Sequence, residues 1–133
     1  MTVVRFGVSL EQELLTALDA FVRENHFSNR SQAVRQLINN NLVEKKWESN
    51  EQVAGAISLV YDHHKRELLN NLADLQHDYH DVILATQHFH LDHDHCLEII
   101  AVKGESAKLS LLANKLIALK GIRHGNLTMS SSS

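Results

Sequence analysis

The sequence predicts an α+β fold in two parts: a short N-terminal unit of one strand and two helices, and a longer C-terminal unit of order βαββαβ. Two observations predict this fold. Residues 4–10, VRFGVSL, alternate apolar and polar side chains, which is typical of a strand, and two amphipathic helical patterns follow. From residue 53 onward, short apolar runs typical of strands are separated by two further helical patterns.

Composition narrows the class of protein. The chain has 133 residues, of which 44% are hydrophobic and 22% charged, as is typical of one ordinary globular domain or two small ones. No apolar run approaches the roughly 18–20 residues needed to span a membrane. The single cysteine excludes an internal disulfide, so we expect a cytoplasmic protein. The net charge of −3 means that any nucleic-acid surface must be local.

The N-terminal unit, predicted to span residues 1–47, begins with the strand. Ser9 and Gln12 have the spacing of a capping box, so we expect the first helix to begin there and to end near Asn25. Residues 29–31, Asn-Arg-Ser, predict a turn and the N-cap of a second helix that runs to about Lys46. Residues 48–52 have no periodicity and predict a linker.

The predicted strand has no partner within its own unit, and an unpaired strand edge is unfavourable. We therefore expect two chains to pair their strands as an antiparallel ribbon in a twofold dimer, and such a ribbon fits the major groove of double-stranded DNA. Its outward face would carry Arg5, which can contact guanine, Ser9, which can donate or accept a hydrogen bond, and Gly7, which permits close backbone approach. The alternative is that the strand only dimerises and that Arg5 and Arg35 are solvated charges.

The C-terminal unit is predicted to span residues 53–129, with residues 130–133 as a disordered tail. Strand patterns cover residues 56–61 and 82–91, and a tight LDHDH connection leads into a third strand over 96–103. Helical patterns cover residues 65–76 and 109–120, and a last strand covers 126–129. The order βαββαβ is that of ferredoxin-like domains, including ACT-like regulatory domains.

Residues 88–96, HFHLDHDHC, place four histidines beside the only cysteine. His88 and His90 share one face of a strand, and the tight connection brings Cys96 onto the neighbouring strand, about 5 Å away. A thiolate with imidazoles suits a late first-row metal, and a planar N₃S set favours Ni(II) or Cu(II) over tetrahedral Zn(II). A fourth ligand is needed, for which His77 and His80 are the candidates. We expect His80, His93 and His95 to be solvated or to contact ligands, with Asp92 and Asp94 as hydrogen-bond acceptors.

The N-terminal residues RFGVSL, followed by a helix and NRSQAVRQLI, resemble the ribbon-helix-helix repressors. The resemblance implies that the strand reads bases while the start of the second helix grips phosphate through its N–H groups. The residues implied to contact phosphate are Asn29, Arg30, Ser31 and Arg35.

The spacing H-x10-H-x-H-x5-C, from His77 through His88 and His90 to Cys96, resembles the nickel-responsive regulators of the NikR family. The resemblance runs from about residue 5 to residue 129. It implies one square-planar Ni(II) per subunit, with His88, His90 and Cys96 from one chain and His77 from a neighbour. It also implies a homotetramer, built as a dimer of dimers, that binds a palindromic operator and represses nickel uptake genes.

Further residues take roles from this resemblance alone. Lys65 and Arg66 would face the DNA backbone, and Tyr61, His63 and Glu98 would contact the ligands. The family often carries two acidic residues, four apart, that hold a cation between the domains. Gln32 and Gln36 occupy those positions here, and neutral amides are weaker ligands for a hard cation, so this cation site is in doubt.

Three alternatives stay open. The chain could sense copper, zinc or cobalt, because the donor set also suits these metals. It could bind a small molecule through an ACT-like domain, although no loop signal for such a site is evident. A zinc metalloenzyme is the third, but no general base or nucleophile constellation emerges, so we expect no enzymatic activity.

Overall fold

A computed structural model describes residues 2–132 of the chain. The chain divides into two compact units, the first ending at Asn41 and the second beginning at Leu42, and each is described by itself. Among the residues that the structure describes, no helix has the length and apolar character to cross a membrane.

The N-terminal unit contains α1 (Gln12–Glu24) and the first part of α2 (Arg30–Glu48). Asn29 caps α2, because its side-chain oxygen accepts a hydrogen bond of 2.9 Å from the backbone N–H of Gln32. This confirms the predicted turn. The predicted cap at Ser9 is wrong, because Glu11 is the N-cap of α1 and its extended backbone delays the helix to Gln12.

Residues 3–11 form no strand in the single chain, so the strand predicted over residues 4–10 is absent from it. The backbone is extended but has no ladder partner among residues 2–132, and a strand exists only where another strand accepts and donates its hydrogen bonds. Phe6 is 77% exposed and Val8 is 66% exposed. This apolar segment therefore lacks the partner that its pattern requires, and the predicted pairing with a second chain stays a prediction.

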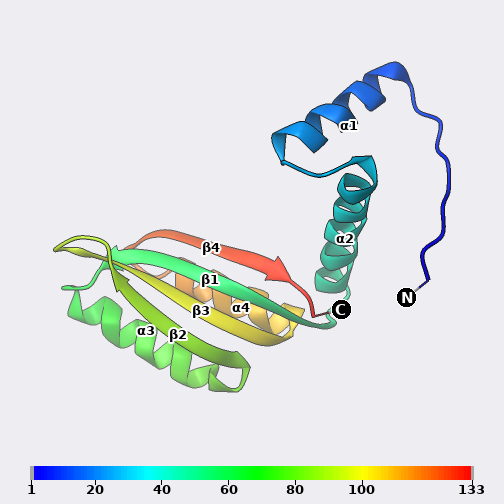
Figure 1. Ribbon diagram of the computed structural model, residues 1–133. Helices are drawn as coiled ribbons and strands as arrows, with labels where there is room; N and C mark the ends of the chain where they lie inside the picture. The colour runs from blue at the N-terminus through cyan, green and yellow to red at the C-terminus, as the bar shows by residue number, and fades with distance from the viewer. Residues whose placement is uncertain (1, 133) are drawn as a thin grey trace. The chain divides into compact units, whose positions relative to one another are not determined.

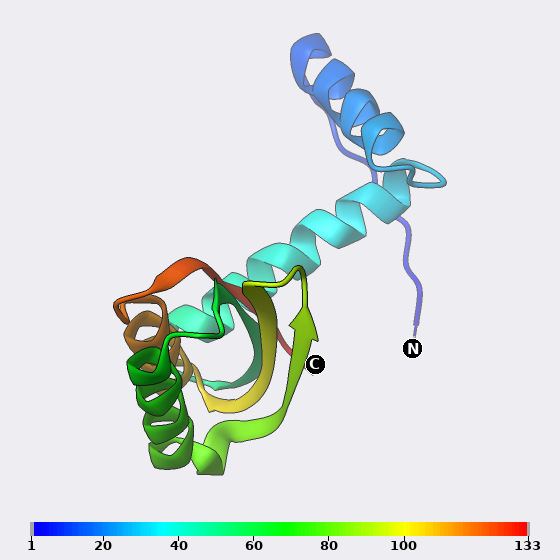
Figure 2. The ribbon, with the colours of Figure 1, turned by 90° about the vertical axis from the view of Figure 1, so that its left-hand side faces the viewer.

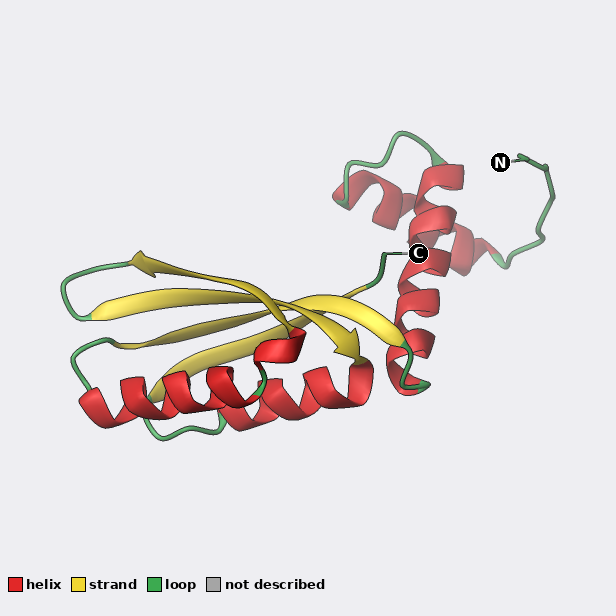
Figure 3. Cartoon of the chain, turned by 90° about the horizontal axis from the view of Figure 1, so that it is seen from below, coloured by secondary structure: helices red, strands yellow, loops and turns green. Residues whose placement is uncertain are grey.

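The C-terminal unit is a four-stranded antiparallel sheet with two helices on one face (Figures 1 and 3). The strand order is β2-β3-β1-β4, and each neighbouring pair is antiparallel. Figure 2 shows α3 (green) and α4 (orange) side by side on the same face of the curved sheet. The order βαββαβ predicted for this unit is confirmed. Its elements are β1 (Gln52–Asp62), α3 (Arg66–Asp78), the 3-10 turn η1 (His80–Val82), β2 (Ile83–His90), β3 (His95–Glu105), α4 (Ser106–Ile117) and β4 (Ile122–Ser130).

The core of this unit lies between the sheet and the two helices. Alternate residues of β1 and β3, such as Ile57 and Ile100, are fully buried, and Leu109 and Leu116 of α4 pack onto them. Burying each such side chain contributes about 1.5–3 kcal/mol, which fixes the register of the strands. The same alternation continues along β3 to Glu98 and Cys96, so the predicted metal ligands lie on the helix-covered face.

The C-terminal end of α2 belongs to this core. Trp47 is buried, and its indole N–H donates a hydrogen bond of 3.0 Å to the carbonyl of Ser130 in β4. The Ser106 hydroxyl at the start of α4 donates a hydrogen bond of 2.6 Å to the carbonyl of Trp47. Residues 49–51 then lead into β1, with Asn50 at a positive φ of 51°. The last turn of α2 is thus attached to both β4 and α4.

Candidate metal centre

The strand register brings three of the four predicted ligands together. His90 lies directly opposite Cys96 in the β2–β3 ladder, and His88 lies opposite Glu98. Residues directly opposite each other in an antiparallel pair point to the same face of the sheet. The imidazoles of His88 and His90 and the thiol of Cys96 therefore share one face, as the sequence predicts.

The thiol and the imidazoles differ in exposure. Cys96 is 3% exposed and is a free cysteine, whereas His88 and His90 lie at the surface. Tyr61 of β1 is the other cross-strand neighbour of Cys96 and is also buried. A thiolate in this position would lie at the bottom of a site whose imidazoles form the rim.

His88 is oriented by a buried carboxylate. Its Nε2 atom lies 2.8 Å from Oε1 of Glu98, a residue that is 1% exposed. This contact leaves Nδ1 of His88 as the ring nitrogen available to a metal. A carboxylate behind a histidine ligand fixes the orientation of the ring and raises its basicity.

Glu98 is the centre of a small hydrogen-bond network. Tyr61 donates its hydroxyl to Oε1, and Gln76 of α3 donates its amide to Oε2 at 2.5 Å. The Thr86 hydroxyl donates in turn to the side-chain oxygen of Gln76 at 3.1 Å. Burial and the hydrogen bond to Glu98 raise the pKa of Tyr61 above its ordinary range, so that its hydroxyl remains a donor. The resemblance implies that Tyr61 and Glu98 contact the metal ligands. In the structure the Tyr61 hydroxyl donates a hydrogen bond to Glu98.

His77 lies in the last turn of α3 and is exposed. Its ring stacks on that of His80, with ring centroids 6.0 Å apart, and its carbonyl lies 2.9 Å from Nδ1 of His80. Within residues 2–132 the structure gives the His77 ring no contact with His88, His90 or Cys96. The resemblance assigns this ligand to a neighbouring subunit.

The other two histidines of residues 88–96 are His93, in the turn after β2, and His95, the first residue of β3. Nδ1 of His95 lies 3.0 Å from Oδ1 of Asp92, so the expected contact between these residues is present. Backbone N–H groups of Asp94 and His95 hold the pKa of Asp92 below its usual range. His63 lies beside His90, with ring centroids 4.9 Å apart.

One group of ligand atoms is preassembled in the single chain, and the sequence patterns did not predict it. Among residues 2–132, the trio in which every ligand atom lies within 4.8 Å of the others is His64, His93 and Asp94. His64 lies outside residues 77–96, where the sequence concentrates its histidines. A usable signal exists: the antiparallel pairing of β1 with β3 puts Asp62 opposite His95, so the residues that follow β1 must lie beside those that precede β3.

The residues predicted to contact DNA are all exposed, and Arg30 is in addition bound to an acidic side chain. Its guanidinium donates to both carboxylate oxygens of Asp19, at 2.8 and 3.0 Å, and this contact lowers the pKa of Asp19. Gly7 has open space around it, since an added Cβ would meet nothing within 4 Å. The other exposed residues of this set are Arg5, Ser9, Asn29, Ser31, Arg35, Lys65 and Arg66.

The segment before α1 lines a hollow of about 1270 Å³ within the N-terminal unit. Phe6 and Val8 line it together with Leu15 of α1 and Val34 and Ile38 of α2. Arg5, Ser31 and Arg35 also reach this hollow. The N-terminal strand and helices of a second chain would cover this apolar lining in the predicted dimer.

The two glutamines that replace acidic residues have local partners. The side-chain oxygen of Gln32 accepts a hydrogen bond of 2.6 Å from the backbone N–H of Ser28. The amide of Gln36 donates to the side chain of Asn40 at 2.9 Å. Both contacts lie within the N-terminal unit, but only the Gln32 contact occupies a side-chain oxygen of the kind that a cation binds, because Gln36 donates through its amide nitrogen.

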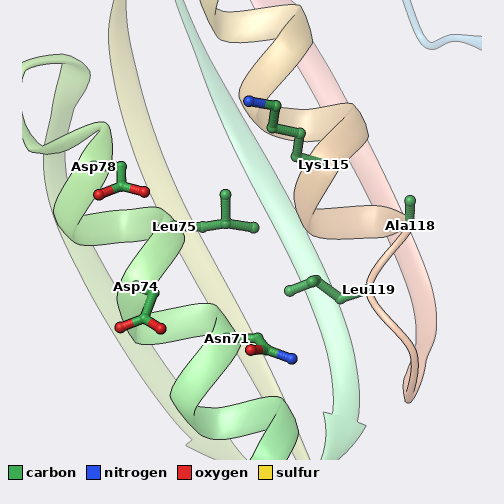
Figure 4. Close-up of a pocket in the computed structure, with 7 residues that line it drawn as sticks. All are labelled: Asn71, Asp74, Leu75, Asp78, Lys115, Ala118 and Leu119. Carbon is green, nitrogen blue, oxygen red and sulfur yellow. The ribbon is translucent and has the colours of Figure 1, made fainter.

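A separate groove of about 430 Å³ lies between α3 and α4 (Figure 4). Its lining contains no histidine or cysteine, so it differs chemically from the metal centre. The lining residues are Asn71, Asp74, Leu75, Asp78, Lys115, Ala118 and Leu119.

Comparison with known proteins matches both units. The family described as "NikR C terminal nickel binding domain" matches residues 54–130, and "Ribbon-helix-helix protein, copG family" matches residues 4–45. A relative from Syntrophus aciditrophicus named "Putative nickel-responsive regulator" is 55% identical over 128 residues, which cover 96% of this chain and 93% of the relative. One from Chlorobium phaeobacteroides is 52% identical over 129 residues, covering 97% and 96%. An uncharacterized protein from Thermotoga maritima shares the fold, with a TM-score of 0.54 and 15% identity over 59% of this chain and 98% of its own.

Proposed function

Because the chain belongs to the family of nickel-responsive regulators, in which a ribbon-helix-helix unit precedes a nickel-binding domain, we propose a specific site and response for it. Each subunit binds one Ni(II) through His88, His90 and Cys96, and His77 of a neighbouring subunit completes a planar set. The metal-bound homotetramer, a dimer of dimers, presents two ribbon-helix-helix units to operator DNA and represses nickel uptake genes. The protein is a transcription regulator and not an enzyme.

The observation that carries this proposal is the shared face of the β2–β3 ladder. A buried thiol lies directly across from one imidazole, and a second imidazole is held by Glu98. One sulfur and several imidazole nitrogens form a donor set that late first-row metals prefer to hard cations. The sulfur itself is shielded from water, whereas the imidazoles lie at the surface.

Because one coordinating side chain would come from another subunit, metal binding could control the assembly of the tetramer. A ligand can shift a conformational equilibrium only if it binds one state more tightly than the other. The complete four-ligand set would exist only in the assembled tetramer, so the metal would favour that assembly. His77 supports this role, because it is exposed and makes no contact with the other three ligands within the described chain.

The DNA side of the proposal depends on the N-terminal segment. Paired ribbons would present Arg5 and Ser9 to the major groove, while the start of α2, capped by Asn29, would face phosphate. Lys65 and Arg66, exposed at the start of α3, would add phosphate contacts in the metal-bound form.

The test is operator binding by the full chain with and without Ni(II), at a stated salt concentration. Nickel should strengthen binding by the wild-type protein, and Cys96→Ala and His90→Ala should abolish that stimulation. His124→Ala is the matched control, because it removes an exposed histidine of β4 and should respond as the wild type does. A full nickel response in Cys96→Ala or His90→Ala would refute the site.

The same donor set could hold copper, zinc or cobalt, so the test includes each metal. Planar Ni(II) bound to a thiolate absorbs in the near ultraviolet, whereas Zn(II) is spectroscopically silent. Stronger stimulation by zinc or copper than by nickel, at equal free-ion concentration, would identify a different physiological metal.

A further inference from the structure

Tyr79, the C-cap residue of α3, joins that helix to α4. Its ring is buried in the core between the sheet and the helices, with 9% of its surface exposed. Nζ of Lys115 in α4 donates a hydrogen bond of 2.9 Å to the Tyr79 hydroxyl. A buried tyrosine usually finds a partner for its hydroxyl, and here α4 provides that partner.

A groove separates α3 from α4 near this bond. Asp78, the last residue of α3, and Lys115 line the groove from opposite helices (Figure 4). Among residues 2–132, no ion pair joins Lys115 to Asp78 or to Asp74, the other acidic residue of the lining. The ammonium of Lys115 therefore holds the end of α3 through the Tyr79 hydroxyl.

A second lysine of α4 holds the turn that follows Tyr79. Nζ of Lys108 donates to Oδ2 of Asp81 at 2.5 Å and lies 5.9 Å from the centroid of the Tyr79 ring. The bond from Lys108 lowers the pKa of Asp81, so the carboxylate remains charged at neutral pH. Both partners of this pair are largely exposed, and such pairs contribute little by themselves. The buried Tyr79 is therefore the stronger of the two attachments to α4.

The position of His77 depends on the same short segment. The ring of His80 stacks on that of His77, with an interplanar angle of 27°, and Nδ1 of His80 lies 2.9 Å from the carbonyl of His77. The backbone N–H of Tyr79 donates to the carbonyl of Leu75 at 3.1 Å and so closes the last turn of α3. Because His77 lies between these contacts, its placement follows that of Tyr79 and His80.

An exposed ligand at a helix end needs such support. The last carbonyl groups of a helix have no partner within it, so helix ends fray. A side chain that must be ordered during binding lowers the affinity, because ordering it costs free energy. An end of α3 that is already fixed avoids this cost for His77.

We propose that Tyr79 is a positioning residue for nickel coordination: together with Lys115 it fixes the end of α3 and so presents His77 to the nickel of a neighbouring subunit. The inference rests on the proposed function, in which His77 is the fourth ligand. Tyr79 does not touch the metal and acts through the placement of His77. The affinity of each nickel site therefore depends on a contact between two helices of the subunit that supplies only one of the four ligands.

The test measures the nickel affinity of the full-length protein by competition with a chelator of known affinity. Tyr79→Phe keeps the buried ring and removes the hydroxyl, so it should weaken nickel binding by about 2- to 10-fold, the range of one hydrogen bond. Lys115→Met should give the same loss, and the double variant should lose no more than either alone, because both changes remove one bond. Lys115→Arg should restore most of the affinity, since a guanidinium also donates. Wild-type affinity in Tyr79→Phe would overturn the proposal.

A double-mutant cycle with His77 separates positioning from a general structural effect. His77→Ala removes the proposed fourth ligand, so in that background Tyr79→Phe should cause no further loss of nickel affinity. An equal loss in both backgrounds would show that Tyr79 acts elsewhere, against the proposal. At saturating nickel, Tyr79→Phe should keep the near-ultraviolet thiolate absorption of the wild type, whereas His77→Ala should shift it.

Two matched controls address stability and charge. Trp47→Phe also removes one hydrogen bond of the C-terminal unit and should leave nickel affinity unchanged, because a lower stability does not alter the affinity of a protein that remains folded. Lys45→Met removes an exposed lysine, and therefore the same charge as Lys115→Met, and should bind nickel as the wild type does.

Failure of this inference and failure of the proposed function give different results. If His77→Ala loses nickel affinity while Tyr79→Phe keeps it, Tyr79 is not a positioning residue and the ligand set stands. If His77→Ala binds nickel as the wild type does, the fourth ligand of the proposed function is wrong and this inference falls with it.

Discussion

Nε2 of His88 and Oε1 of Glu98 lie 2.8 Å apart, directly across the β2–β3 ladder, and the carboxylate is almost completely buried. A buried charge is stable only when it is paired or hydrogen-bonded. Glu98 meets this condition through the Tyr61 hydroxyl and the Gln76 amide as well as His88. The ring of His88 is therefore held in place before any metal arrives.

Glu98→Gln should weaken nickel binding by about 10–100-fold, because His88 loses the carboxylate that orients it while the side chain keeps its size. Competition with a chelator of known affinity measures the change. Tyr61→Phe should have a smaller effect, since it removes one donor to Glu98 and leaves the contact with His88. Glu105→Gln, at the far end of β3, is the control. If Glu98→Gln bound nickel as the wild type does, His88 would not depend on this carboxylate.

Asp19→Asn should strengthen binding to operator DNA, because Asp19 holds the guanidinium of Arg30 in two hydrogen bonds. This contact lowers the pKa of Asp19. The ion pair is therefore fully present at every pH above the usual pKa of an aspartate, and it is lost only as the pH falls through the lowered pKa. At neutral pH the pair therefore competes with phosphate for Arg30. Once Arg30 is released from Asp19, it should contact one more phosphate. The slope of log affinity against log salt concentration should then steepen by about 0.9.

The measurement is a salt titration of operator binding, with Glu13→Gln as the matched control. Glu13 is also an exposed acid on α1, so both substitutions change the net charge equally. Equal slopes for the two variants would show that Arg30 gains no phosphate contact when Asp19 is removed.

Trp47→Phe should lower the free energy of unfolding of the C-terminal unit by about 0.5–1.5 kcal/mol. The indole hydrogen bond to the Ser130 carbonyl is lost, while most of the apolar contact remains. Urea unfolding followed by circular dichroism measures the loss, because Trp47 is the only tryptophan and its fluorescence disappears with it. Ser106→Ala, which leaves the Trp47 carbonyl without its donor, should give a loss of similar size. Unchanged stability in both variants would show that these two bonds do not hold the end of α2.

Gly55→Ala should destabilise the sheet by about 1–3 kcal/mol, because an added Cβ would lie 2.5 Å from the backbone carbonyl oxygen of Thr128. That oxygen is part of the β1–β4 pairing and cannot rotate away. Thermal unfolding of the C-terminal unit measures the effect. Gly7→Ala meets open space and should leave this transition unchanged. A Gly55→Ala protein as stable as the wild type would mean that β4 can shift at no cost.

Much of the C-terminal unit could be predicted because its signals are local. The alternation of strand and helix patterns predicts the βαββαβ order, and the shortness of the LDHDH turn predicts that Cys96 lies on the strand beside the one that carries His88 and His90. The cap at Asn29 was equally local, since its acceptor and donor lie three residues apart. Each of these features depends on a few consecutive residues.

The remaining features depend on contacts between distant residues or on a second chain. The strand over residues 4–10 does not form in the single chain, because no other segment of residues 2–132 exchanges backbone hydrogen bonds with it. The buried network around Glu98 joins β1, α3 and β2, and no pattern within one element indicates it. His64 becomes a ligand candidate only once β1 is known to pair with β3.

The exposed side chains of Phe6 and Val8 have a consequence for how abundant this regulator must be. The DNA-reading ribbon proposed above would be shared by two polypeptides and would form by a second-order reaction, so its amount would fall faster than the total amount of protein when expression is low. Below the dissociation constant of the pair, halving the number of molecules would reduce the competent species about fourfold, however much nickel is present. A cell could then silence the response by limiting synthesis of the protein, without any change in metal supply.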